Sequence, residues 1–273
     1  MVILICLTQI IGCAQNSDMI ALILSISPTN SQPKGNKYFG FELGGDVFDT
    51  DINNKELFRL DRSYYLSLYG QSPERLRGTL YRSYLGVKFE KVILSNSIAI
   101  GAGLRFELTY SDIKPFYSFF ESEGPGYVFF LIQQNENSSH FIRINKIRFL
   151  GYSLSIPIDI KYFPFEEHFF RPYLVGCFEN SFRIGKDETV KFANSELNIY
   201  ESEVFQTFDN PQVYFSRLSG GVGFKLGREE SKINIQLELK IPAYLTKDQS
   251  SLVDHSLGVQ LQAGFLVKLN NTQ

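Results

Sequence analysis

Residues 150–162, LGYSLSIPIDIKY, alternate between two classes of side chain. The even positions are apolar or aromatic (Leu150, Tyr152, Leu154, Ile156, Ile158, Ile160, Tyr162), and the odd positions are small or polar (Gly151, Ser153, Ser155, Pro157, Asp159, Lys161). Because successive side chains of a β-strand point to opposite faces, this pattern predicts a strand with one apolar and one polar face. A helical period would instead scatter the apolar residues around the circumference.

The length of this predicted strand suits a membrane. Tyr152 and Tyr162 lie about ten residues apart, which corresponds to roughly 24 Å along the membrane normal at about 3.3 Å per residue and a tilt of about 40–45°. That distance matches the apolar band of an outer-membrane barrel between its two aromatic girdles.

The same alternation recurs along the chain and predicts about eight strands. They cover residues 38–48, 79–91, 98–110, 150–162, 170–184, 213–226, 233–242 and 256–269. Most reach the roughly 9–11 residues that a tilted membrane-spanning strand needs, whereas strands of globular proteins average about five or six. The sequence therefore predicts an all-β fold, a closed antiparallel up-and-down transmembrane β-barrel.

The connections between these strands alternate strictly in length. Four are long, at residues 49–78, 111–147, 185–212 and 243–255, and three are short, at 92–97, 164–169 and 227–232. Long external loops and short periplasmic turns are typical of a transmembrane barrel. An even number of strands then places both termini of the chain in the periplasm.

If the apolar faces point to lipid, the other faces line the interior. The predicted inward charges are Glu42, Asp46, Arg82, Lys88, Glu90, Arg105, Glu107, Asp159, Lys161, Glu179, Arg183, Arg217, Lys225, Glu238, Lys240 and Lys268. An eight-stranded interior is just wide enough for side chains to fill it, and an unpaired buried ion costs several kcal/mol. We expect a structural network of ion pairs, with a narrow proton or ion path as the alternative.

The amino-terminal region predicts export from the cytoplasm. Residues 2–12 are a short apolar run of the length of a secretory segment, so we assign residues 1–14 to a signal segment, 15–37 to a linker and 38–269 to the barrel. Acylation of Cys13 and cleavage near Ala14-Gln15 both fit, and a buried amino-terminal strand or helix is the alternative. Cys6, Cys13 and Cys177 have neither disulfide nor metal-site spacing, and we expect no cofactor.

Charge and composition exclude other classes of protein. The 27 Lys+Arg and 29 Asp+Glu give a net charge of -2, so the chain lacks the cationic excess that nucleic-acid binding needs. A hydrophobic content of 44% excludes general disorder.

Catalytic residues are sparse in the sequence. A barrel enzyme that acts on lipid would need a serine, a histidine and an acid near its outer rim. The candidates are His140 with Ser138 or Ser139, and His255 with Asp254 and Ser256; His168 falls in a predicted turn at the other end. Such residues are common in surface loops, so we predict no catalytic, cofactor-binding or metal-binding site.

The long loops at 112–146 and 185–212 are the expected binding regions for protein partners. The first contains the apolar residues 127–132 (YVFFLI) and 141–144 (FIRI), which predict a hairpin that either extends the barrel or folds into its mouth. Phe116, Tyr117, Phe119 and Phe120 form either an exposed recognition patch or internal packing of the loop.

The chain resembles the PorT-type outer-membrane β-barrel domain family. The resemblance rests on residues 154–165 (LSIPIDIKYFPF), on 171–176 (RPYLVG), on 220–226 (GGVGFKL) and on the closing alternating strand, and it covers roughly residues 38–269. It implies a small barrel in the outer membrane of a Gram-negative cell. The family is functionally mixed, with some members that serve protein secretion, and has no common catalytic residues to transfer.

We therefore expect a small outer-membrane β-barrel that is not an enzyme, contacts outer-membrane lipid and has a structural or accessory role in secretion or surface binding. One alternative is a barrel enzyme that acts on lipid. Another is a soluble, lipocalin-like barrel that binds a ligand, in which the apolar face would point inward.

Overall fold

The structure, a computed structural model, describes residues 36–60, 75–93, 97–116, 127–135, 138–165, 169–228, 231–244 and 252–269. The predicted signal segment at 1–14 and all but the last two residues of the predicted linker therefore lie outside the described residues, as do Tyr117, Phe119, Phe120 and His168.

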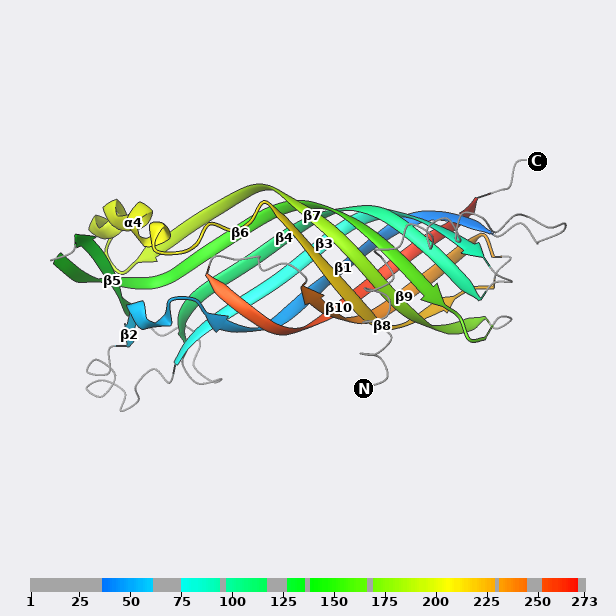
Figure 1. Cartoon of the computed structure of the whole chain (residues 1–273), viewed down its shortest axis with the longest axis horizontal. Coiled ribbons are helices and arrows are strands. Elements are labelled where there is room, and N and C mark those ends of the chain that lie inside the picture. Colours follow the sequence, from blue (N-terminus) through cyan, green and yellow to red (C-terminus); the bar gives the residue numbers. More distant parts are fainter. Residues whose placement is uncertain are drawn as a thin grey trace, which may run out of the picture. The chain divides into compact units, whose positions relative to one another are not determined.

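Eight strands form a closed antiparallel barrel (Figure 1). They are β1 (Lys37–Ile52), β3 (Arg75–Ile93), β4 (Ile98–Phe116), β6 (Ser138–Tyr162), β7 (Phe170–Phe192), β8 (Tyr214–Leu226), β9 (Ile233–Tyr244) and β10 (Val253–Leu269). Each pairs with the next one in this order, and the pairing of β1 with β10 closes the ring. The predicted fold class is confirmed.

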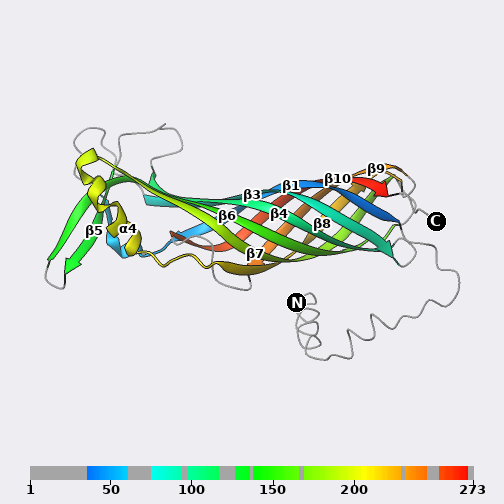
Figure 2. The ribbon, with the colours of Figure 1, turned by 90° about the horizontal axis from the view of Figure 1, so that it is seen from above.

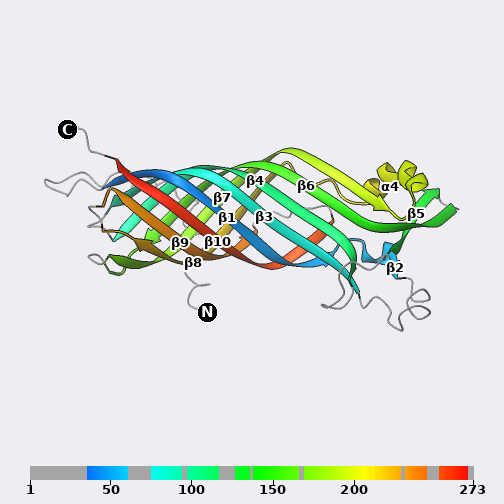
Figure 3. The ribbon, with the colours of Figure 1, turned by 180° about the vertical axis from the view of Figure 1, so that it is seen from behind.

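The first and last strands meet at the end of the barrel that carries the short turns. Lys37 lies opposite Leu269 in the register between β1 and β10, which places the start and the finish of the barrel at its periplasmic end. Figure 3 shows β1 and β10 side by side along the wall. The alternation of long and short connections therefore predicted correctly which connections lie at each end of the barrel.

Several strands continue beyond the membrane-spanning part and form an extracellular cap (Figure 2). β4 pairs with β6 only as far as Ile113 opposite Ile147; beyond that point β5 (Val128–Asn135) pairs with β6, and β2 (Phe58–Leu60) pairs with β5. The cap consists of β2, β5, the outer ends of β6 and β7, and the helices η1 (Lys55–Leu57), η2 (Ser195–Tyr200) and α4 (Glu201–Gln206). The hairpin that extends the barrel is therefore the correct alternative.

The strand boundaries differ from those expected at this outer end. Residues 111–147 were expected to be a connection, but most of those described are strand, and β7 runs to Phe192 instead of residue 184. The physical reason is pairing beyond the bilayer: β6 and β7 support each other as far as Ile144 opposite Phe192, where no lipid limits their length.

Burial in the barrel is inverted relative to a soluble protein. The side chains of Ile156 and Leu237 are each 47% exposed, whereas Arg105 is completely buried. Apolar side chains therefore face outward to lipid and charges fill the interior, as in barrels of the outer membrane. This arrangement contradicts the soluble, lipocalin-like alternative. None of the described helices has both the length and the apolar character to cross a bilayer.

Candidate functional site

The interior of the barrel is filled by three successive layers of side chains. From the periplasmic end outward we name them the lower aromatic layer, the ion-pair layer and the cap core. The ion-pair layer consists of the two clusters of buried charges described below, one around Arg105 and one around Lys161. Tyr38, Val92, Ala99, Phe163, Tyr173, Val175 and Leu266 make up the lower aromatic layer. The layers matter for function because they determine whether anything can pass along the axis.

Arg105 connects opposite walls of the barrel in the ion-pair layer. Its Nε donates to Glu42 Oε1 of β1 at 2.5 Å, and its Nη1 donates to Glu179 Oε2 of β7. Strands β1 and β7 stand four places apart in the eight-stranded ring, so they face each other across the lumen. A single guanidinium group therefore bridges the full width of the interior.

Two further arginines surround the same carboxylate. Arg82 donates from Nη1 to Glu179 Oε1 at 3.1 Å and to Glu107 Oε1 at 3.2 Å. Arg217 ion-pairs with Glu179 and, at 2.8 Å, with Asp46. All five side chains are at most 2% exposed. Each buried charge thus has an opposite partner, which the cost of burying an unpaired ion requires.

A second cluster nearer the periplasm is built on lysines. Lys161 Nζ lies 2.9 Å from Glu90 Oε2 and 2.8 Å from Glu238 Oε1. Lys88 forms an ion pair with Asp159. These residues come from β3, β6 and β9, so this cluster also ties non-adjacent strands together.

Aromatic rings close the barrel below the lysine cluster. Lys225 Nζ lies 4.1 Å from the centroid of the Tyr38 ring, a cation–π distance. Tyr173 donates its hydroxyl to Glu238 Oε1 at 2.9 Å. The Tyr173 ring occupies space that a Cβ at Gly223 would need, since the ring carbon Cζ lies closest to that position. A glycine at this position therefore makes room for the lower aromatic layer.

The predicted inward charges are confirmed with two exceptions. All are buried except Arg183 and Lys268, which are half-buried at the two ends of the interior. Arg171 was missing from the prediction, although it is 1% exposed and lies over the Phe163 ring. The signal that could have found it is the alternation of β7, which places odd residues of its lower part inside.

Apolar residues fill the outer end of the barrel and form the cap core. It comprises Phe48, Phe58, Leu80, Ile113, Val128, Phe130, Ile132, Ile142, Ile144, Ile147, Phe149, Val190, Phe192, Val204, Phe208, Leu252 and Val253. The Phe130 ring contacts Phe58 at 5.0 Å and Phe208 at 6.0 Å between centroids. Side chains from β2, β5 and the segment after α4 therefore converge above the ion-pair layer.

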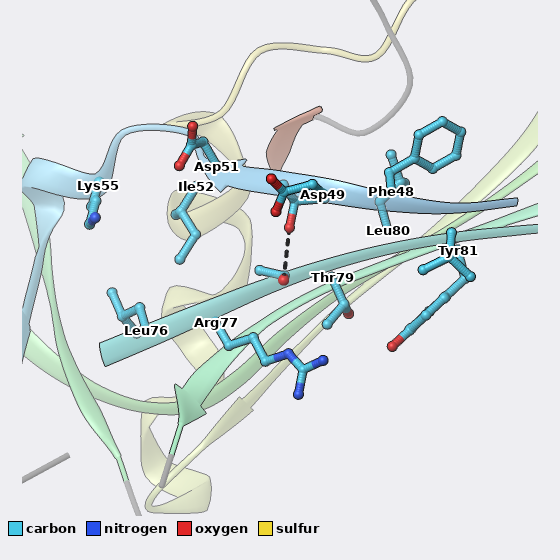
Figure 4. A pocket seen from close by; sticks show the side chains of 13 residues that line it. Phe48, Asp49, Asp51, Ile52, Lys55, Leu76, Arg77, Thr79, Leu80 and Tyr81 are labelled. Carbon is cyan, nitrogen blue, oxygen red and sulfur yellow. Dashed lines mark hydrogen bonds between the residues drawn. The ribbon is translucent and has the colours of Figure 1, made fainter. Parts of the chain in front are cut away.

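A cleft of about 290 Å³ opens where β1 and β3 separate. Their pairing ends at Phe48 opposite Leu80, β1 has an irregular register between Phe48 and Thr50, and Thr50 Oγ1 donates to Gly78 O at 2.8 Å. Figure 4 shows Asp49, Asp51 and Arg77 among the side chains that line it. The described lining contains no histidine, cysteine or serine.

The candidate histidines do not form a catalytic group with each other. His140 lies in β6 opposite Ile132 of β5, whereas His255 lies in β10 opposite Thr50 of β1. The His140 ring contacts Tyr200 at 5.1 Å, and its Nε2 is buried without a hydrogen-bond partner within the described part of the chain. The side chains of Ser138, Ser139, His255 and Ser256 lie outside what the structure describes.

Metal-binding clusters are absent from the described residues. No group of three or more His, Cys, Asp or Glu side chains there is arranged to hold an ion. Cys177 is a buried free thiol in β7.

Comparison with known proteins adds only distant likenesses. No protein-family model and no curated protein matches the chain. Among solved structures it is similar to the outer membrane protein OprG from Pseudomonas aeruginosa, with 13% identity and a TM-score of 0.42 over 89% of this chain and 100% of that one. It is also similar to the N-terminal β-barrel domain of OprF from the same organism, with 11% identity and a TM-score of 0.29 over 85% and 98% of the two chains.

A third solved structure is an enzyme. The outer membrane protease OmpT from Escherichia coli has 10% identity and a TM-score of 0.28 over 88% of this chain and 97% of that one. Likenesses this remote carry no argument about the function of this chain. Its position in the outer membrane is instead read from its own ring of strands and inverted burial.

Proposed function

We propose that this protein is a non-conducting, non-enzymatic outer-membrane scaffold that holds an ordered extracellular cap. The observation that carries the proposal is the filled interior: an aromatic layer, an ion-pair layer and an apolar cap core follow one another along the axis. A channel needs a continuous polar path, whereas two of these three layers are apolar or aromatic.

The ion pairs favour a structural interior over a proton or ion path. Arg105 and Arg217 each contact carboxylates on strands that are not their neighbours, so they hold the walls together across the lumen. A buried charge that is fixed by two or three partners is costly to move, because leaving its partners exposes it to the low dielectric of the interior.

The cap supports a role in binding partner proteins. It is built largely from the segments 112–146 and 185–212, the two long connections that the sequence marked as binding regions. Its apolar core gives it a defined shape, and rigid elements present a binding surface more precisely than loops do. The resemblance to PorT-type barrels adds a specific role to this proposal, as an accessory component of protein secretion.

Planar-bilayer recording of the purified chain tests the proposal. We expect no stable conductance steps from the wild-type protein. The variant Arg82→Ala/Arg105→Ala/Arg217→Ala removes three large side chains from one level of the interior. Its conductance is compared with that of the wild-type protein, to show how far the ion-pair layer closes the barrel. Large, stable steps from the wild-type protein would overturn the non-conducting scaffold.

Binding to the cap is tested separately. The complete chain, inserted in vesicles, would be crosslinked to outer-membrane and secreted proteins of its host. Crosslinks that map to residues 127–146 and 185–212 are expected. Crosslinks confined to the periplasmic turns would contradict a binding role for the cap.

A further inference from the structure

Three strands of the cap form a small sheet whose two faces differ. On one face, Val128, Phe130 and Ile132 of β5 are buried in the cap core. Figure 1 shows β2 and β5 at the end of the molecule away from the barrel. The side chains between the buried ones point to the opposite face, which we name the outer cap face. Its members are Arg59 of β2, Tyr127, Phe129 and Leu131 in or just before β5, and Phe141 and Arg143 of β6.

The strand register brings two arginines to either side of one aromatic ring. Phe129 lies opposite Arg59 of β2 and opposite Arg143 of β6. Leu131 lies opposite Phe141. Residues directly opposite each other in an antiparallel pair share a face of the sheet. Neighbouring strands are about 4.7–4.9 Å apart, so the backbones of the two arginines are roughly 10 Å apart, with apolar side chains between them.

Aromatic rings hold the guanidinium group of Arg143 in place. Its carbon Cζ lies 4.9 Å from the centroid of the Tyr127 ring and 5.7 Å from that of the Phe129 ring. The Phe129 ring in turn meets the Phe141 ring edge-on, at 6.4 Å between centroids. A guanidinium group that lies over a ring uses its flat face for that contact. The N–H groups at its edge are left to bind a planar anion such as a carboxylate.

The two arginines have no carboxylate partner within the described part of the chain. Arg59 donates from Nη1 to the backbone oxygens of Glu56 and Phe58, at 3.0 and 3.3 Å. Arg143 forms neither an ion pair nor a side-chain hydrogen bond with any described residue. Both side chains are exposed. Carboxylates on a partner would therefore complement the charge of this face.

The outer cap face also exposes apolar side chains far from lipid. Phe141 is 50% exposed, and the cap core lies on the other side of the sheet. Phe141 precedes Tyr152 of the outer aromatic girdle by eleven residues of β6, which at the tilt of the barrel strands is roughly 25 Å. Apolar patches exposed to water mark sites where other proteins bind, and aromatic residues and arginine are enriched in such interfaces.

We infer that the outer cap face docks a segment of a partner protein that carries carboxylates next to aromatic or aliphatic side chains. The apolar side chains of the partner cover Phe129, Leu131 and Phe141, and its carboxylates pair with Arg59 and Arg143. Because the rings already orient the guanidinium group of Arg143, little side-chain freedom is lost on binding. The inference rests on the proposed binding role of the cap, and it adds the surface and the chemistry of the partner.

Selection from a phage library of random peptides, against the full chain in lipid nanodiscs, tests this chemistry. We expect enrichment of Asp or Glu next to Phe, Tyr, Trp or Leu. The affinity of a synthetic copy of the most enriched peptide, measured by surface plasmon resonance, should fall at least about tenfold in Phe141→Ala/Arg143→Gln. The matched control is Ile199→Ala/Arg148→Gln, which removes an exposed apolar side chain and an exposed arginine outside this face. It should change the affinity less than about twofold.

The other outcomes would overturn the inference. They are selection of basic or neutral peptides or of none, and an affinity that is unchanged in Phe141→Ala/Arg143→Gln or falls equally in the control. Displacement of the peptide by lipopolysaccharide micelles would also overturn it, because the ligand of the face would then be a glycolipid. If the variant does not fold, the wild type decides alone: the selected peptides must be acidic and aromatic, and their binding must weaken with added salt.

Failure of this inference can be told apart from failure of the proposed function. A peptide whose binding ignores the outer cap face, together with partner crosslinks elsewhere on the cap, overturns the inference and leaves the scaffold with its binding role standing. Conductance of the wild-type protein, or crosslinks confined to the periplasmic turns, would instead overturn the proposed function.

Discussion

The guanidinium group of Arg105 on β4 is ion-paired with the carboxylate of Glu179 on β7 across the interior of the barrel. The same guanidinium reaches Glu42 on β1, which faces β7 from the other side of the ring. Neighbouring strands are already joined by backbone hydrogen bonds, so this contact adds stability of a different kind, between walls that the sheet does not connect.

Replacement of Arg105 by methionine should destabilise the barrel strongly. Removing one partner of a buried ion network leaves charge poorly compensated, here chiefly on Glu42, whose remaining cation, Lys88, lies 3.8 Å away. We therefore expect a loss of about 3–5 kcal/mol in the free energy of unfolding. Urea unfolding of the protein in lipid vesicles measures this change. The control is Arg148→Gln, which removes the exposed pair with Asp187 and should cost less than about 1 kcal/mol. Equal losses in the two variants would contradict the structural role of the ion-pair layer.

A charge on the lipid-facing wall should destabilise the barrel according to its depth. Leu237 lies in the middle of β9, and its side chain is 47% exposed on the outer face. The substitution Leu237→Arg should cost about 2–4 kcal/mol, because it places a cation near the bilayer midplane. Ile233→Arg at the start of the same strand should cost roughly 1 kcal/mol or less, since the interface is within reach. Unfolding in vesicles of both variants checks this gradient, and no difference between them would argue against the assigned membrane position.

Truncation of Phe130 should unfold the cap without opening the barrel. Phe130 is completely buried against Phe58 and Phe208, so Phe130→Ala should remove about 3–5 kcal/mol of local stability. Limited proteolysis would then cut the cap faster, while the mobility of the folded barrel in a gel stays unchanged. Phe141→Ala provides the comparison, because this neighbouring β6 side chain is 50% exposed and its loss should leave the cleavage rate nearly unaltered.

Asp112, at the outer end of β4, should make the stability of this region depend on pH. Burial raises the pKa of its carboxyl, but hydrogen bonds from Lys146 and Thr79 outweigh this effect and hold the pKa below its ordinary value of 3.8. Burial likewise opposes the charge on Lys146, yet its hydrogen bonds to Asp112 and Tyr110 raise its pKa above the ordinary 10.5.

The sign of the pH dependence follows from these directions. The carboxyl pKa of Asp112 is lower in the folded protein than in the unfolded chain. It therefore contributes stability that is fully present above pH 3.8 and is lost as the pH falls through the pKa of the folded state. The pKa of Lys146 is higher in the folded protein than in the unfolded chain. It therefore contributes stability that is fully present below pH 10.5 and is lost as the pH rises through the pKa of the folded state. Comparison with Asp112→Asn should show a difference of about 1 kcal/mol in unfolding free energy at neutral pH, after allowance for the partly exposed lysine. Unfolding curves should show this difference shrinking below pH 3.8; a constant difference would contradict the assignment.

Much of the barrel could be predicted from residue spacing. The alternation at residues 150–162 predicts both the strand and the face that meets lipid, because each strand position has one of two directions. The inward charges of the ion-pair layer follow from the same rule. The alternation of β7 also places Arg171 in the interior, although the prediction did not include it.

The cap was harder to predict because only part of its pairing is sequential. Residues 127–132 and 141–144 predict the hairpin of β5 with the outer end of β6, but β2 pairs with β5 across a long stretch of chain. A short apolar piece such as residues 58–60 does not specify its partner, since several strand edges could accept it.

The sequence by itself determined the fold class, the strands and the orientation of their faces, because side-chain alternation with period two is a local property of an extended chain. Only the tertiary structure decided which charge meets which, that Arg105 bridges Glu42 and Glu179, and that apolar cap residues close the outer mouth. Those contacts depend on the closure of the ring and on the stagger between strands, which bring residues far apart in the chain to the same height along the barrel axis.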